Sequence, residues 1–199
     1  MRILAVGTAG DVGKAAVAEL RPRHKIITAG RSSGDVRVDL LDASSISAMF
    51  EKLGKLDAVV ACAGHAHYGP LAGMTETQFM KGLKDKLMGQ VNLVLLGTPY
   101  VNDRGSFTLT SGVLDRDPIL KGVNGATVNA ALKGFVTAAA IELERGIRIN
   151  VVSPGLLEDS EKKYAGLFPG QEMVSSKRVG LAYAKSVEGV LTGQVIIIA

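Results

Sequence analysis

The sequence has a single cysteine, no tryptophan and only 5% aromatic residues. Because Cys62 stands alone, no disulfide can form within the chain, which is typical of a reducing compartment. No apolar run approaches the ~20 residues that span a bilayer. The short apolar stretch at the N-terminus runs directly into glycines and does not resemble a signal peptide. We therefore expect a cytoplasmic protein that does not cross a membrane.

Clustered positive charge is also lacking. The formal net charge is +4, and the 23 lysine and arginine residues are scattered along the chain. Proteins that bind nucleic acids usually carry a basic stripe or aromatic stacking platforms, so we expect no nucleic-acid partner. His65 and His67 have no acidic or cysteine partner at a ligand spacing, so we expect no metal site. A mildly basic surface does suit an anionic cofactor.

Short apolar stretches alternate with helical stretches along the chain. We expect strands at residues 2–7, 24–30, 35–40, 56–64, 106–112, 147–153 and 194–199. We expect helices at residues 11–23, 42–54, 75–97, 123–144 and 175–189. A repeated strand–helix pattern produces a parallel sheet with right-handed crossovers. The prediction is one α/β domain over residues 1–199, a doubly wound parallel sheet of about seven strands with helices on both faces (Rossmann type).

The segment GTAGDVG, residues 7–13, joins the first strand to the first helix. Glycines in this context let the chain turn tightly and let backbone N–H groups approach a pyrophosphate, and the helix N-terminus adds donors and a positive dipole end. A tight turn without a ligand is the alternative. We expect a dinucleotide to be bound here through Gly7, Thr8, Gly10, Asp11, Val12 and Gly13.

The second strand ends without a carboxylate, in the sequence AGRS at residues 29–32. NAD-binding folds usually carry an acidic residue at this place for the ribose hydroxyls. Arg31 can pair with a 2′-phosphate instead, and Ser32 can add a hydrogen bond. This favours NADP(H) over NAD(H), with a solvated loop arginine as the alternative interpretation.

Residues 105–155 contain a strand that ends in Ser111, a long helix, another strand and a Pro-Gly pair. This order resembles the catalytic half of a short-chain dehydrogenase/reductase, and the resemblance covers nearly the whole chain. It implies that further residues contact a nicotinamide cofactor: Asp39, Leu40, Ala63, Gly64, Asn129, Pro154, Gly155 and Leu156.

The resemblance also identifies a change at the reaction centre. In that family the long helix carries a Tyr as proton donor and a Lys four residues later. When VNAALKGF is aligned with that helix, the two positions hold Gly125 and Asn129. Ser111 stands at the position of the family's serine, and Lys86 at that of its helical Asn. We expect Ser111 and Lys86 to polarise the substrate oxygen, with water or a loop side chain giving the proton; a turn serine and a surface lysine are the alternatives.

The resemblance implies an NADP(H)-binding oxidoreductase that acts on a small carbonyl or alcohol through an altered catalytic site. Because Gly125 cannot transfer a proton, the alternative is a non-catalytic NADP(H)-binding sensor or assembly module. Tyr68 and Tyr164, in loops at the ligand edge, are candidate acids outside the helix. By analogy with the family, the helices at 75–97 and 123–144 predict a homodimer or homotetramer.

Overall fold

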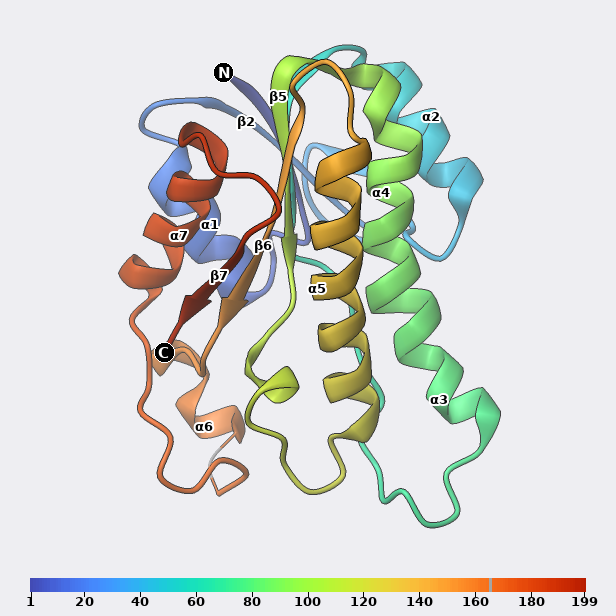
Figure 1. The fold of residues 1–199 in the computed structure, drawn as a ribbon, viewed down its shortest axis with the longest axis vertical. Coiled ribbons are helices and arrows are strands. Elements are labelled where there is room, and N and C mark those ends of the chain that lie inside the picture. Colours follow the sequence, from blue (N-terminus) through green and yellow to red (C-terminus); the bar gives the residue numbers. More distant parts are fainter. Residues whose placement is uncertain (165) are drawn as a thin grey trace.

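Seven parallel strands form one sheet in the computed structural model, which describes residues 1–164 and 166–199 (Figure 1). Their order across the sheet is β3-β2-β1-β4-β5-β6-β7. The strands are β1 (Arg2–Val6), β2 (Lys25–Gly30), β3 (Val36–Arg37), β4 (Leu56–Ala61), β5 (Val101–Thr110), β6 (Arg148–Pro154) and β7 (Val195–Ile198). The predicted doubly wound α/β fold is confirmed.

Helices cover both faces of this sheet (Figure 1). α1 and α7 pack together on one face, while α2, α4 and α5 cover the other. The helices are α1 (Asp11–Leu20), α2 (Ala43–Leu53), α3 (Glu76–Gly82), α4 (Gly89–Gly97), α5 (Val123–Glu142), α6 (Glu161–Tyr164) and α7 (Ser176–Glu188).

Successive residues of β1 belong to two separate cores. Ile3 is fully buried in the core beneath α1 and α7, which also contains Tyr183. Leu4 is fully buried in the core on the opposite face, where Phe50 of α2 lies. A parallel strand covered on both faces needs apolar side chains at every position, which explains its unbroken apolar sequence.

The helix predicted at residues 75–97 contains an interruption. It begins at a capping box, in which Thr75 and Gln78 bond each other reciprocally. A π-helical turn, Leu83–Met88, then joins α3 to α4. Such a turn accommodates an extra residue, which changes the direction of neighbouring side chains, and it is frequent at functional sites.

β3 and β5 differ most from their predicted bounds, while the other strands differ by one to three residues at an end. The strand predicted at 35–40 is reduced to the two residues of β3, because the chain turns at Asp39. The backbone N–H of Asp39 donates to Ser45 Oγ at 2.9 Å, and its carboxylate accepts from the Leu41 N–H at 3.0 Å. β5 begins at Val101 rather than at residue 106, and its pairing with β4 shifts register near its start.

The strand order places β1 between β2 and β4, and chain connections on the two sides of β1 run in opposite directions. Ligands of doubly wound folds bind at the carboxyl ends of the strands beside such a switch point. In Figure 1 these ends face downwards, and the loops that follow β4, β5 and β6 gather below them together with α6. A ligand site is therefore expected at this edge.

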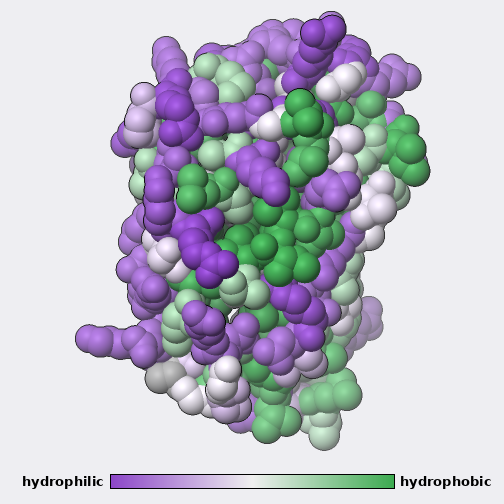
Figure 2. Space-filling view, turned by 60° about the vertical axis from the view of Figure 1, so that its left-hand side comes forward, coloured by the Kyte–Doolittle hydropathy of each residue, from purple (hydrophilic) through white to green (hydrophobic). Residues whose placement is uncertain are grey.

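The outer face formed by α7 and β7 is partly apolar. Leu181 of α7 and Ile197 of the edge strand β7 are about half exposed. Figure 2 brings this side forward and shows an area of apolar residues near its middle. Exposed apolar area next to an edge strand is typical of a protein contact surface. The homodimer or homotetramer stays a prediction. Across the described residues, every helix is too short or too polar to cross a bilayer.

Candidate functional site

A cavity of about 510 Å³ opens at the carboxyl edge of the sheet. This volume lies in the range of cofactor and small-molecule pockets. Almost all of the predicted site residues line it: Gly7, Thr8, Gly10, Asp11, Val12, Arg31, Ser32, Asp39, Leu40, Ala63, Gly64, Lys86, Ser111, Asn129, Pro154, Gly155 and Leu156. Gly13 is the exception, since it is absent from the cavity wall.

The glycine loop is packed so closely that a side chain would not fit at Gly7 or Gly13. Gly7 has a φ of +82°, and a Cβ there would lie 2.6 Å from the backbone nitrogen of Ala63. A Cβ at Gly13 would lie 2.7 Å from the Cα of Thr8. Gly13 therefore allows α1 to begin directly against the loop. The first N–H groups of α1 have no intrahelical acceptor and face the cavity edge, where an anion is favoured.

The end of β2 offers a cation to the cavity. Arg31 and Ser32 are exposed and line the wall. The nearest carboxylate in sequence, Asp35, is occupied elsewhere: it accepts from the N–H and the hydroxyl of Thr28, at 2.9 and 2.8 Å. The two Thr28 hydrogen bonds hold the pKa of Asp35 below its usual value. An anionic group near Arg31 thus meets a positive charge without a competing carboxylate on the same loop.

Two polar atoms at the predicted reaction centre are buried without a hydrogen-bond partner among residues 1–164 and 166–199. They are the hydroxyl of Ser111 and the side-chain oxygen of Asn129. The amide nitrogen of Asn129 does have a partner, the backbone oxygen of Gly112 at 3.2 Å. Buried polar atoms normally find partners, so two such atoms on one cavity wall indicate a place where a polar ligand completes the hydrogen bonding.

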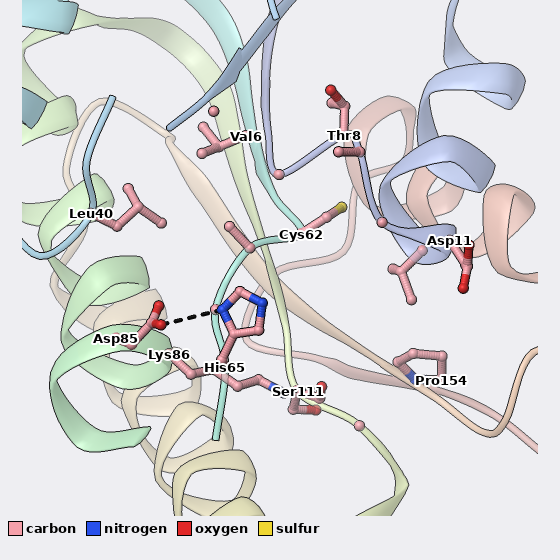
Figure 3. A pocket seen from close by; sticks show the side chains of 18 of the residues that line it. Val6, Thr8, Asp11, Leu40, Cys62, His65, Asp85, Lys86, Ser111 and Pro154 are labelled. Atoms are coloured by element: carbon pink, nitrogen blue, oxygen red, sulfur yellow. Dashed lines mark hydrogen bonds and ion pairs between the residues drawn. The ribbon is translucent and has the colours of Figure 1, made fainter. Parts of the chain in front are cut away.

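Lys86 extends from the π-helical turn towards Ser111 (Figure 3). Its ammonium donates a 2.8 Å hydrogen bond to the backbone oxygen of Ser111. Asp85, the preceding residue, also lines the cavity but faces His65, with 3.3 Å between the carboxylate and Nδ1 (Figure 3). The turn therefore presents a cation to the inner wall and a carboxylate to the mouth.

Burial lowers the pKa of Lys86 to about 8, and the negative charge of Asp115 opposes this shift. Asp115 belongs to a short 3-10 turn after β5, Val113–Asp115, and its side chain is fully buried. It pairs with Lys133 of α5 at 2.9 Å and with Arg116 at 3.5 Å. Because Asp115 is shared between two other cations, it compensates the Lys86 charge only in part.

The space at Gly125 is already occupied. A Cβ at Gly125 would lie 2.8 Å from Leu114 Cδ1 and 3.6 Å from the hydroxyl of Tyr68. Tyr68 comes from the loop after β4 and lines the cavity. Burial, with a smaller contribution from Tyr164, raises the pKa of Tyr68. The hydroxyl of Tyr68, from another loop, thus lies close to the place where a side chain at residue 125 would begin.

Sequence reasoning did not find Asp115 or Asn124. The buried Asn124 accepts from the His67 N–H at 2.8 Å and donates to the Phe79 oxygen at 2.7 Å, which ties the loop after β4 to α3 and α5. Asn124 belongs to no motif that a sequence would reveal. Asp115 follows Ser111 by a short turn, and nothing in one sequence separates it from a surface carboxylate.

The segment after β6 closes the remaining side of the cavity. Ser160 donates a 2.7 Å hydrogen bond to the carboxylate of Asp11, which fastens this segment to the start of α1. Tyr164 and Phe168 form an edge-to-face pair with ring centroids 6.3 Å apart, and both line the cavity. The cavity thus has a polar half at the glycine loop and an aromatic half here.

Similarity to known proteins agrees with this geometry. A family model described as enoyl-(acyl carrier protein) reductase matches residues 4–188. Uncharacterized oxidoreductases of Mycobacterium bovis and Mycobacterium tuberculosis are 30% identical over 146 residues. That match covers 67% of this chain and 59% of each relative, so the chain spans less than two thirds of their length.

Solved structures resemble the whole chain. The protein lin1944 from Listeria innocua is 44% identical with a TM-score of 0.98, and the match covers 100% of both chains. A small-chain dehydrogenase in complex with NADPH is 26% identical with a TM-score of 0.86, over 98% of this chain and 95% of that one. With the sheet order, the glycine loop and the match to residues 4–188, these likenesses lead to one conclusion: the chain belongs to the short-chain dehydrogenase/reductase family.

Proposed function

We propose that this protein is an NADP(H)-dependent oxidoreductase that interconverts a small carbonyl compound and its alcohol. The observation that carries the proposal is that the Lys86 ammonium donates to the backbone oxygen of Ser111, whose buried hydroxyl has no partner among the described residues, on the wall of a dinucleotide-type cavity. A hydroxyl and a cation at one point are suited to hold and polarise a carbonyl oxygen.

The residues present fit a nicotinamide dinucleotide. The crowding around Gly7 leaves no room for side chains, so backbone donors and the start of α1 are available to a pyrophosphate. Arg31 supports a 2′-phosphate, and the free oxygen of Asn129 is an acceptor for a ribose hydroxyl. The NADPH complex of the 26% identical dehydrogenase supports the same cofactor class. The bound cofactor supplies a hydride.

The aromatic half of the cavity supports a small, largely apolar substrate. Tyr68, Leu114, Tyr164 and Phe168 line it. Lys86 lies on the wall of the same cavity and provides a cationic anchor for the reacting oxygen. A carbonyl group attached to a small apolar body satisfies both features.

Two residues of this chain, Ser111 and Lys86, would act on the substrate oxygen in different ways. The Ser111 hydroxyl, which lacks a partner, orients this oxygen by donating to it. Lys86 stabilises the negative charge that develops on the oxygen when the carbonyl carbon is reduced. A cation that is already held in place on a partly buried wall stabilises such a charge more than bulk solvent does.

Two measurements on the full chain test the proposal. Thermal unfolding with NADPH and with NADH measures cofactor binding, and loss of absorbance at 340 nm with a panel of small aldehydes, ketones and α-diketones measures turnover. We expect a larger rise in Tm with NADPH than with NADH, and oxidation of NADPH by at least one carbonyl. A flat response to both cofactors contradicts the proposal; binding without any turnover favours a cofactor sensor.

A further inference from the structure

A carbonyl reductase must give a proton to the oxygen that it reduces, and α5 cannot do so here. Gly125 has no side chain, and Asn129 is an amide whose nitrogen is bonded to the Gly112 oxygen. The proton must therefore come from water or from a side chain on another element of the cavity wall. Described groups that can release a proton and line the cavity belong to four side-chain types: lysine, tyrosine, histidine and cysteine.

Three of these types are poorly suited. Burial raises the pKa of Cys62 to about 11, so its thiol is a weak acid. His65 is 86% exposed and faces Asp85 at the mouth of the cavity. Two tyrosines line the cavity: burial raises the pKa of Tyr68, which makes its hydroxyl a weaker acid, and Tyr164 packs edge-to-face against Phe168 in the segment after β6.

Lys86 has the position that the others lack. Its ammonium is 2.8 Å from the Ser111 backbone oxygen, on the same residue whose hydroxyl is buried and unpartnered (Figure 3). That hydrogen bond uses one of three N–H groups, and neither of the other two has a described acceptor. An oxygen held by the Ser111 hydroxyl therefore lies beside free N–H donors.

Two features of the backbone place Lys86 here. The π-helical turn Leu83–Met88 redirects the side chain within an otherwise helical segment. Gly64 lets the turn approach, because a Cβ there would lie 2.6 Å from the Cα of Lys86. A lysine on the surface would require neither the π-helical turn nor the close approach at Gly64.

We propose that the Lys86 ammonium is itself the proton donor of carbonyl reduction, replacing with one side chain both the Tyr and the Lys that are absent at positions 125 and 129. This inference rests on the proposed function and specifies its chemistry. NADPH is the reductant: the carbonyl carbon gains its hydride, and the C=O π pair moves to the oxygen. One N–H bond of Lys86 breaks as the O–H bond forms, leaving a neutral amine that water reprotonates.

The charges around Lys86 suit this role. On its own turn, Asp85 faces His65 of the loop after β4 rather than the ammonium. From the turn after β5, Asp115 faces Lys86 but is paired with Lys133 of α5. With little compensation, burial lowers the pKa to about 8. A general acid acts best when its pKa is near the working pH, and Lys86 meets that condition while remaining mostly protonated at pH 7.

Of the other titratable groups around the cavity, Asp11 accepts from Ser160, Asp39 accepts from the Leu41 N–H, and Arg31 lies at the end of β2. Arg116, next to Asp115, donates to the backbone oxygen of Ser153 at 3.3 Å and shares the Asp115 charge. Tyr164, from the segment after β6, contributes to the raised pKa of Tyr68. Among the described charges, Asp115 is thus the one that opposes deprotonation of Lys86.

The test compares Lys86→Arg with wild type. Arginine keeps the positive charge but does not release a proton at accessible pH. The matched control is Lys84→Arg, an exposed residue on the same turn that is not part of this cavity wall. NADPH affinity is measured by fluorescence, and kcat is measured with the small probes 2,3-butanedione and benzaldehyde. Competitive acetylation of Lys86, followed by peptide mass spectrometry, gives its ionisation without any need for turnover.

For Lys86→Arg we expect a loss in kcat of about 10²-fold or more, with NADPH affinity changed by less than about threefold. In wild type, kcat/KM should fall as pH rises through about 8, and acetylation of Lys86 should rise over the same range. An arginine variant that keeps most of the turnover overturns the inference but leaves the proposed function intact. A larger loss in Tyr68→Phe than in Lys86→Arg also overturns it. Failure of wild type to bind NADPH, or to reduce either probe, instead counts against the proposed function.

Discussion

Gly64 and Lys86 approach each other so closely that a Cβ at Gly64 would lie 2.6 Å from the Cα of Lys86. The contact joins the loop after β4 to the π-helical turn. Gly64 also has a φ of +121°, a backbone conformation that other residues rarely adopt. This glycine therefore sets how deeply Lys86 enters the cavity, in addition to leaving room for a cofactor as the family resemblance implies.

Gly64→Ala should reduce the free energy of unfolding by about 2–4 kcal/mol, because backbone strain adds to overpacking against Lys86. Urea denaturation measures the change. Gly134→Ala is the matched control, because Gly134 lies inside α5 and a Cβ there meets nothing within 4 Å. The control should be neutral or more stable by up to about 1 kcal/mol. Equal stability of the two variants would show that the close approach has no energetic consequence.

Lys86→Met should make the protein more stable at pH 7. The pKa of Lys86 is lowered from 10.5 to about 8, so folding penalises the charged form. At 1.36 kcal/mol per pKa unit, this penalty is at most roughly 3 kcal/mol, and water reaching the half-buried side chain reduces it.

The sign of the pH dependence follows from the same shift. Between about pH 8 and pH 10.5 the unfolded chain binds more protons than the folded chain, so wild-type stability rises with pH relative to the variant. The advantage of Lys86→Met should thus be complete below pH 8 and vanish near pH 10.5. Urea denaturation at pH 7 and pH 10 tests this, with exposed Lys84→Met as control. A variant less stable than wild type at pH 7 would contradict it.

Arg31→Ala should weaken NADPH binding by about 10-fold or more while changing NADH binding by less than about twofold. The reason is that a hydrogen bond to a charged group contributes about 1.5–3 kcal/mol, and only NADPH has the 2′-phosphate. Arg37→Ala is the control: Arg37 is exposed on the same segment, donates to the Gly34 oxygen at 2.7 Å and is not part of the cavity wall. Fluorescence titration gives both affinities. Equal weakening of NADPH and NADH would refute a role in discrimination.

The sequence predicts the sheet well because each strand repeats the same physical requirement. β1 is buried on both faces and needs apolar residues throughout, so its pattern is unambiguous. β3 is different, because Asp39 forms local hydrogen bonds that end the strand early. Local side-chain bonding competes with sheet pairing, and an apolar–polar alternation does not reveal which prevails.

The site is predictable where motif and backbone coincide, and not where side chains from separate elements meet. The glycine loop lines the cavity as expected, apart from Gly13, whose small size serves helix packing. The π-helical turn that redirects Lys86 leaves no signal, because one extra residue hardly disturbs a helical pattern. The approach of the Tyr68 hydroxyl to Gly125 depends on the conformation of the loop after β4, which the local sequence does not determine.

Asp115→Asn should lower the pH at which Lys86 loses its proton. The negative charge of Asp115 raises the pKa of Lys86 against the effect of burial, so its removal leaves burial unopposed. Competitive acetylation measured against pH gives the midpoint directly, and this midpoint should fall below the wild-type value near pH 8.

The control for this variant is Asp117→Asn, an identical change at an exposed carboxylate two residues along the chain. It should leave the Lys86 midpoint where it is in wild type. Asp115→Asn also removes the partner of Lys133, so unfolding free energy should fall by about 1–3 kcal/mol. Acetylation is therefore measured at a temperature well below the Tm of the variant. A midpoint that stays constant or rises would mean that the Asp115 charge does not act on Lys86.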